Sequence, residues 1–377
     1  MLNRTAILAA IAFVLFLLYP IIRNKNNQRT VLAVVLFIFL GVIFLLAVFF
    51  KVESTSGRWF ILQKSFYLFK DHWLKGVGYG KFNPNFNHLQ AEYFSTHSLV
   101  SKEAMLANDG YFAFNEWLHF AIELGVVGLA ISLLVTWVIL KACIMAMGTP
   151  KAWAGALMMA ILVACMFSYP LHDFFIVAIA ALLAGYLAKD IIKIPFRVSF
   201  RLQVSFVTVL ILLLLYFSYK YYNYQQEYSA AKENREAGFK TEAIGICKKI
   251  APEIKKNYSF TIFYLELLYE TNRLGEAIQW FNDFHPYHCN QRAHTIVAKC
   301  FDESGNYSKA EKEYLTALYI TPHLLQSRAD LVMFYDRYKR IDKATYWAQQ
   351  LIDCPIKIEN PKAHYLKKQA KNYLDSH

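Results

Sequence analysis

Long runs of apolar residues dominate the first half of the chain. Each run reaches or approaches the roughly 20 residues that a helix needs to cross about 30 Å of hydrocarbon. Pro170 separates the fourth and fifth runs and predicts a tight turn there instead of one continuous helix. The pattern predicts a polytopic bundle of about six membrane-spanning helices, at 5–22, 30–50, 117–140, 152–169, 172–189 and 202–222.

Residues 223–377 follow a different pattern, which repeats about every 34 residues. The unit from Gly305 to Pro322 is similar to the tetratricopeptide pattern, in which small residues let two antiparallel helices approach closely. This half is therefore predicted to be a tetratricopeptide-like α-solenoid that binds a protein partner, and the whole chain to be all-α. Two positions carry the period: Phe239, Leu274, Tyr307 and Ile341 at one, and Ala243, Ala277, Ala310 and Ala344 at the other.

Composition divides the chain at the same place. Of the 377 residues, 56% are hydrophobic and 18% are charged, below the share of about 25% that is typical of soluble domains. Residues 1–222 hold 18 Lys and Arg against 9 Asp and Glu, whereas residues 223–377 hold 22 against 19. A single soluble globule and a disordered chain are excluded. We expect a transmembrane domain at 1–222, with an extracytoplasmic loop at 51–116, and a repeat domain at 223–377.

The short loops of the first half carry the charge that sets its orientation. Segments 23–29, 141–151 and 189–201 hold nine Lys and Arg residues and alternate so that they share one side of the membrane. The positive-inside rule makes that side the cytoplasm. We therefore expect a multi-pass protein of the cytoplasmic (inner) membrane, with the loop 51–116 and the repeat domain on the periplasmic side.

The loop 51–116 begins with a stripe of aromatic and aliphatic residues at helical spacing. This stripe suits either the membrane surface or packing against the protein's own spans, and the sequence does not decide between them. The glycine-rich run 76–80 lacks the Gly-Lys-Ser/Thr of a phosphate loop, which argues against a nucleotide site. The stripe consists of Trp59, Leu62, Phe66, Phe69 and Trp73.

The loop ends where ionisable residues enter the third predicted span. Glu116, His119 and Glu123 are spaced i, i+3 and i+7, so they share one face of a helix. Ionisable groups at membrane depth are costly and face a polar cavity or one another. The face is either part of a functional site or a structural hydrogen-bonded cluster.

The six cysteines predict neither a disulfide framework nor a metal centre. Two lie in or beside predicted spans, and the other four are scattered without Cys-x-x-Cys or metal-ligand spacing. We interpret all six as buried thiols. They are Cys143, Cys165, Cys247, Cys289, Cys300 and Cys354.

Several segments together resemble the signature of the O-antigen ligase and polymerase family. The resemblance covers about residues 50–190, and relatives with a tetratricopeptide tail occur. Family members usually have ten or more spans, so we expect further spans encoded upstream of Met1 or a truncated, inactive member. The segments are Gly57-Arg58, Lys70-Asp71, Gly76–Phe82, Phe114–Leu118, Glu123–Gly128 and Phe167–Leu171.

The resemblance implies an inverting membrane glycosyltransferase that uses neither a nucleotide sugar nor a metal or other cofactor. Such an enzyme moves a glycan from an undecaprenyl pyrophosphate donor to a lipid acceptor, such as lipopolysaccharide core, or to a protein. One departure is Phe114, because family members often have His directly before the Asn that corresponds to Asn115. Two other function classes stay open: a non-catalytic membrane scaffold that recruits partners through its repeats, and a transporter of lipid-linked glycans.

The implied chemistry assigns roles to individual residues. Arg58 matches the family's recurrent arginine and is the best cation for the leaving phosphate, since a guanidinium grips phosphate oxygens with two hydrogen bonds. The base that activates the acceptor is Glu116, His97 or His172. The expected substrate-binding residues are Lys75, Lys81, Asn115 and His119.

The repeat pattern generates a direct test. We expect residues 223–377, expressed alone, to fold as a soluble and almost entirely helical domain, because four units repeat in phase with an ordinary charge content. Far-ultraviolet circular dichroism of this fragment measures the outcome. A spectrum with little helix, or with substantial strand, would contradict the interpretation.

Overall fold

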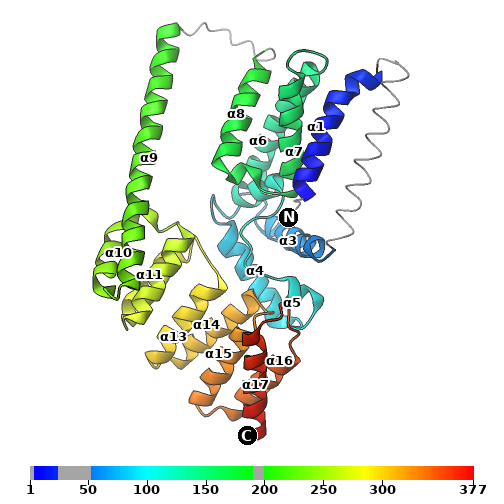
Figure 1. Cartoon of the computed structure of the whole chain (residues 1–377). Helices are drawn as coiled ribbons and strands as arrows, with labels where there is room; N and C mark the ends of the chain where they lie inside the picture. Colours follow the sequence, from blue (N-terminus) through cyan, green and yellow to red (C-terminus); the bar gives the residue numbers. More distant parts are fainter. Residues whose placement is uncertain (1–3, 24–51, 190–198) are drawn as a thin grey trace. The chain divides into compact units, whose positions relative to one another are not determined.

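The computed structural model describes residues 4–23, 52–189 and 199–377, and every regular element in these ranges is a helix (Figure 1). The all-α prediction is confirmed for this part of the chain. Packing divides the chain into two compact units. The first comprises Met1–Phe86 with Gly110–Ile194, and the second comprises Asn87–Asp109 with Pro195–His377.

The first unit is built from apolar helices. α1 (Arg4–Arg23) packs against α7 (Ala152–Phe167), which in turn packs against α6 (Glu116–Ala146) and α8 (Phe174–Ala188). Gly155 makes the approach of α1 possible, because a Cβ atom there would lie 2.9 Å from Cζ of Phe16. The short helix η1 (Pro170–His172) separates α7 from α8, which confirms the predicted turn.

Among the described residues, Glu116–Ala146 is the helix that is long and apolar enough to cross a membrane by length and composition. Three shorter apolar helices cover Thr5–Pro20, Ala152–Phe167 and Phe174–Ala188. The predicted span 30–50 lies outside the described residues, and the span 202–222 falls within α9 (Phe200–Glu236). The number of six spans therefore stays a prediction.

α6 is interrupted at Gly125, whose backbone leaves the helical region with φ 67° and ψ −159°. The turn that follows α3 (Val52–Asp71) enters this break and makes backbone hydrogen bonds on both sides of it. These bonds replace those that the helix loses at the interruption. They run from Val77 N to Ile122 O (2.8 Å), from Gly78 N to Glu123 O (2.9 Å) and from Val126 N to Trp73 O (2.7 Å).

Two glycines make this close contact between backbones possible. Gly76 has φ 69°, and a Cβ atom on it would lie 2.4 Å from the carbonyl oxygen of Glu123. A Cβ atom on Gly125 would lie 2.3 Å from the carbonyl oxygen of Leu74. Neither position has room for a side chain, and both require a backbone conformation that glycine adopts most easily. The glycine-rich run 76–80 thus fixes the break in α6.

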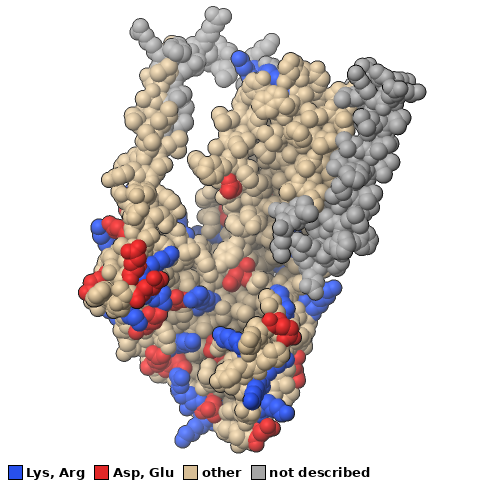
Figure 2. Space-filling model, viewed as in Figure 1, with Lys and Arg blue, Asp and Glu red and all other residues tan. Residues whose placement is uncertain are grey.

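The second unit contains the helical repeats. The first helices of four successive pairs begin at residues 240, 274, 307 and 341, so the predicted period of about 34 residues is present in the structure. The four recurring alanines have no exposed surface. Figure 2 shows Lys, Arg, Asp and Glu side chains gathered over these helices. The helices are α10 (Lys240–Ile254), α11 (Tyr258–Glu270), α12 (Leu274–Phe284), α13 (Gln291–Glu303), α14 (Tyr307–Ile320), α15 (Leu325–Arg337), α16 (Ile341–Asp353) and α17 (Pro361–Ser376).

Residues 87–109 belong to this second unit, although the sequence assigns them to the loop of the membrane domain. They contain most of α4 (Phe82–Thr96) and all of α5 (Lys102–Leu106). Buried amides join the segment to the repeats, since their donor groups satisfy carbonyl oxygens at the ends of repeat helices and in the loops between them. The bonds run from Asn87 to Cys289 O (2.5 Å) and from Gln90 to Ile320 O (2.6 Å), and Arg328 donates to Leu99 O (3.1 Å).

The backbone contact at the break in α6 predicts a large effect of adding a single carbon. Gly76→Ala and Gly125→Ala should each cost more than about 2 kcal/mol, because the new Cβ atom meets a carbonyl group and the backbone has positive φ. Thermal unfolding of the full chain in detergent measures the change. Gly185→Ala in α8 is the matched control, because a Cβ atom there meets no atom within 4 Å. Equal midpoints for all three variants would contradict the argument.

Candidate active site

One end of the first unit is organised by Asn115, the residue before α6. Its backbone is extended, with φ −153° and ψ 117°, and its Oδ1 accepts a hydrogen bond of 2.9 Å from Leu118 N. This is a helix N-cap, and it fixes where α6 begins. The amide nitrogen of Asn115 donates in the other direction, to Met166 O at 3.2 Å. Asn115 therefore joins the start of α6 to the end of α7.

Arg58 of α3 reaches the same helix end. Its Nη1 donates to Phe167 O at 3.3 Å, and the same atom lies 3.5 Å from the hydroxyl of Thr5. The last carbonyls of a helix have no partner within the helix, and a positive charge beside them is favourable. The guanidinium carbon also lies 5.1 Å from the centre of the Phe114 ring, in a cation–π contact. Phe114 thus contacts Arg58 directly.

Glu116 is the first residue of α6 and is almost fully buried, with 2% exposure. Its Oε1 accepts a hydrogen bond of 2.7 Å from Leu171 N, which fixes the carboxylate at the Pro170 turn. Its Oε2 lies 3.5 Å from Nδ1 of His172 and has no hydrogen-bond partner among the described residues. A carboxylate and an imidazole from segments 56 residues apart in sequence thereby face each other.

The predicted polar face of α6 is present in its first two turns. His119 Nε2 lies 3.4 Å from Glu123 Oε1, and all three residues of the face are buried. Glu123 also accepts a hydrogen bond of 3.3 Å from Phe82 N, just beyond the glycine-rich run. The ring of His119 lies 4.8 Å from that of His172, measured between ring centres, so the face continues toward the Pro170 turn.

Aromatic rings that the sequence analysis did not single out enclose this group. Phe112 stacks on Tyr169 with ring centres 4.1 Å apart and meets the edge of His172 at 4.5 Å. Phe82 packs on His119 at 4.8 Å. The aromatic run 111–114, directly before the cap residue, is the signal in the sequence that could have found part of this enclosure.

The structure brings together five of the predicted site residues: Arg58, Asn115, Glu116, His119 and His172. The other three lie elsewhere. Lys75 and Lys81 are exposed on the turn between α3 and α4. His97 lies in the second unit, where its ring stacks on Tyr93 and its Nδ1 lies 2.7 Å from Tyr93 O. These contacts with Tyr93 of α4 hold His97 in place.

Two clefts adjoin the group. A cleft of about 460 Å³ between α6, α7 and α8 has almost entirely apolar walls, and Glu116 is its only ionisable lining residue among those described, apart from the thiol of Cys165.

A second cleft of about 410 Å³ lies between α3 and the start of α6, where Asn115 and Leu118 line it. Its other walls come from the predicted stripe, whose Trp59 and Phe66 are more than half exposed. α3 buries Phe60, Ser65 and Leu68 more deeply than the stripe, of which Leu62 and Phe69 are half-buried.

Residues 2–133 match the O-antigen ligase domain. The predicted resemblance is confirmed. Members of this family are membrane-integral proteins of a glycosyltransferase-like class, and the matched segment includes Arg58, Asn115, Glu116 and His119 but ends before the Pro170 turn. The match covers roughly a third of the chain.

Two further comparisons concern whole proteins. The comparison with curated proteins gives no match. Among solved structures, the crystal structure of MamA protein aligns with 40% of this chain and 88% of that chain, at 16% identity and a TM-score of 0.34.

The contacts of Glu116 predict which of its substitutions damages the fold. Glu116→Ala removes the acceptor of the Leu171 N–H and should lower stability by about 1–3 kcal/mol, whereas Glu116→Gln keeps a carbonyl acceptor and should cost less. Thermal unfolding in detergent compares the two variants. Asp71→Ala, at the exposed end of α3, is the control. The idea fails if Glu116→Ala unfolds at the same temperature as Asp71→Ala.

Proposed function

We propose that the protein transfers a glycan from an undecaprenyl pyrophosphate donor to a lipid acceptor, such as lipopolysaccharide core, or to a protein acceptor. The observation that carries the proposal is the meeting of Arg58, Glu116 and His172, from three separate segments, at the end of α7. The family match of residues 2–133 supports the reaction class. The identities of the donor and the acceptor are proposed in addition to this reaction class.

The donor would bind with its two chemically different parts in two environments. The apolar cleft between α6, α7 and α8 suits a polyprenyl chain, because its walls carry aliphatic and small side chains. The pyrophosphate needs cationic donors, and Arg58 offers a planar guanidinium at the same end of the unit. As the sugar–phosphate bond breaks, this charge stabilises the negative charge on the leaving phosphate.

The acceptor hydroxyl must lose its proton during the transfer. Its oxygen forms a bond to the anomeric carbon on the face opposite the phosphate, and the electrons of the breaking bond leave with the phosphate oxygen. The pair of buried Glu116 and solvent-accessible His172 is the proposed base that takes the proton, since the imidazole lies next to a fixed carboxylate. Asn115 and His119 are proposed to contact the substrates, whereas Lys75 and Lys81 lie outside the group that the structure brings together.

The orientation proposed for the membrane follows from the two ends of the first unit. Lys151, directly before α7, lies against Tyr186 near the end of α8, with Nζ 4.9 Å from the ring centre, so a basic residue marks this end of the unit. Arg58 and Glu116 lie at the opposite end of α7. If the basic end faces the cytoplasm, the site lies on the periplasmic side of the inner membrane.

The repeat domain is proposed to bind a protein partner on the same side, as helical repeats commonly do. In the structure, residues 87–109 of this chain belong to the same compact unit as the repeats. This contact makes the non-catalytic scaffold a second candidate, in which the repeats arrange proteins around the membrane domain. Transfer activity separates the two.

Arg58 provides the sharpest test of the enzyme hypothesis. Arg58→Ala should reduce transfer by about 10²–10³-fold, because a charge-stabilising donor in an active site contributes about 2–4 kcal/mol. Arg58→Lys should restore only part of the rate, since it keeps the charge and loses the planar pair of donors. The assay measures glycan transfer from the lipid-linked donor, normalised to membrane-inserted protein.

A structural role of Arg58 gives a different pattern. If Arg58 only caps the end of α7, Lys should serve nearly as well, and Ala should lower the protein level without changing activity per molecule. Lys64→Ala is the matched control, because Lys64 lies on the same helix and contacts the rings of Phe60 and Tyr67. Full activity of Arg58→Ala per inserted molecule would remove Arg58 from the mechanism.

A further inference from the structure

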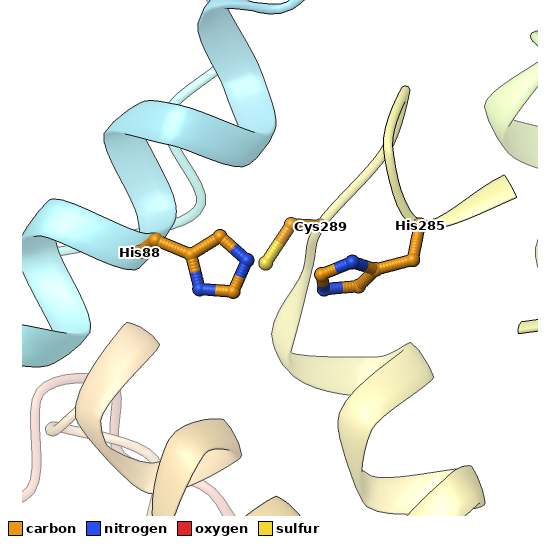
Figure 3. Close-up of side chains that lie close together, drawn as sticks. All are labelled: His88, His285 and Cys289. Atoms are coloured by element: carbon orange, nitrogen blue, oxygen red, sulfur yellow. The ribbon is translucent and has the colours of Figure 1, made fainter. Parts of the chain in front are cut away.

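The second unit brings together two histidines and a cysteine from different segments. His88 lies on α4, His285 directly follows α12, and Cys289 lies in the turn before α13. One ligand atom from each residue lies within 4.8 Å of the others. Figure 3 shows the three side chains converging, with the sulfur of Cys289 between the two imidazole rings. All three belong to the same compact unit.

A third histidine lies beside the group. Nε2 of His294 on α13 lies 3.2 Å from the sulfur of Cys289, and its ring centre lies 5.2 Å from that of His285. The ring centres of His88 and His285 are 5.0 Å apart, and those of His88 and His294 are 6.3 Å apart. Two imidazoles that bind one zinc ion through nitrogens at about 2.1 Å have ring centres about 5 Å apart, so the spacing of His285 from each of the other two suits a shared tetrahedral ion.

The other nitrogen of His294 has a partner of the expected kind. Its Nδ1 lies 2.5 Å from Oε2 of Glu313 on α14. Histidines that bind metals commonly donate their second N–H to a carboxylate, which fixes the ring and its tautomer. Because Glu313 lies against Nδ1, Nε2 is the nitrogen of His294 that faces the cysteine sulfur and the space beside it.

Two other interpretations of the cluster explain less. A Cys289–His294–Glu313 arrangement resembles a nucleophile with its base, but Cys289 is 0% exposed and His294 is 3% exposed, so a substrate has no access. A purely hydrogen-bonded cluster leaves Nε2 of His285 buried without a hydrogen-bond partner among the described residues. Buried polar atoms of this kind need a partner, and a metal ion supplies one.

We propose that His88, His285, Cys289 and His294 bind one Zn²⁺ ion, with Glu313 orienting His294. One thiolate and three imidazoles form a closed tetrahedral set that suits zinc, and binding releases the thiol proton to solvent. The role is structural, because all four positions are filled by protein. The ion fastens α4 to the repeats at the place where Asn87 also bonds to Cys289 O. The ion thus holds residues 87–109 against the repeat helices.

The spacing of the cysteines gave no indication of this site. The six were predicted to be buried thiols, and all six are free and buried. The overlooked signal is the density of ligands in one short stretch, which contains His285, His288, Cys289 and His294 within ten residues. The remaining ligand, His88, is almost 200 positions earlier, and only the tertiary fold brings it close.

The test uses the full chain in detergent, stripped of metal and then titrated with Zn²⁺ and, separately, Co²⁺. We expect one equivalent of either ion per chain, and a near-ultraviolet thiolate-to-cobalt absorption band. His285→Gln and Cys289→Ser should each lower the bound zinc at least tenfold, and Cys289→Ser should abolish the thiolate band. Cys300→Ser is the matched control, because Cys300 is an equally buried cysteine of the same unit that lies outside the cluster.

A measurement on the unaltered chain covers the case in which a variant does not fold. Zn²⁺ should raise the thermal midpoint of the stripped chain, and a chelator should reverse the rise. The proposal is overturned if the stripped chain binds much less than one equivalent of zinc, or if Cys289→Ser keeps the cobalt spectrum of the unaltered chain. None of these readouts depends on glycan transfer, so they stand apart from the proposed enzymatic activity.

Discussion

The backbone contact between the turn after α3 and the break in α6 is the constraint on which the candidate site depends. Gly76 and Gly125 let two chain segments approach so closely that backbone groups bond across the interruption. The break ends the first part of α6 after Leu124, and the same turn leads to Phe82, whose N–H bonds to Glu123. Gly76 and Gly125 therefore fix where the part of α6 that carries the buried polar face ends.

The end of α7 supplies the second half of the arrangement. A helix end offers carbonyl oxygens that need donors, and Asn115 and Arg58 provide them. The turn that follows offers the Leu171 N–H, which Glu116 accepts. Ordinary requirements of backbone hydrogen bonding thus gather an amide, a guanidinium and a carboxylate in one place. The same contacts that complete the fold hold the groups that the proposed transfer needs.

The segment 87–109 connects the two halves in a way that the order of the sequence conceals. It lies in sequence between two parts of the first unit, yet its buried amides bond to carbonyls of the repeat helices and their loops. The repeats therefore hold a piece of the chain that lies, in sequence, between Arg58 and Asn115 of the candidate site. The proposed zinc ion lies on this contact, since one of its ligands comes from α4 and three from the repeats.

Features that repeat along the chain or lie within one segment can be read from the spacing of residues alone. The apolar runs, the turn at Pro170, the period of about 34 residues and the shared face of Glu116, His119 and Glu123 all follow from spacing along one helix or between similar units. The family resemblance was also readable, because its motifs keep their order along the chain.

The meeting of distant segments depends instead on how whole helices pack together. Spacing gives no sign that the glycine-rich run enters α6, that Arg58 caps α7, or that His88 approaches Cys289. These contacts join residues 40 to 200 positions apart, and they depend on close packing of whole helices and on unsatisfied backbone groups at helix ends. A pattern within one segment shows which face of a helix a side chain occupies. The residue that this side chain contacts from another segment is determined by the packing of the complete chain.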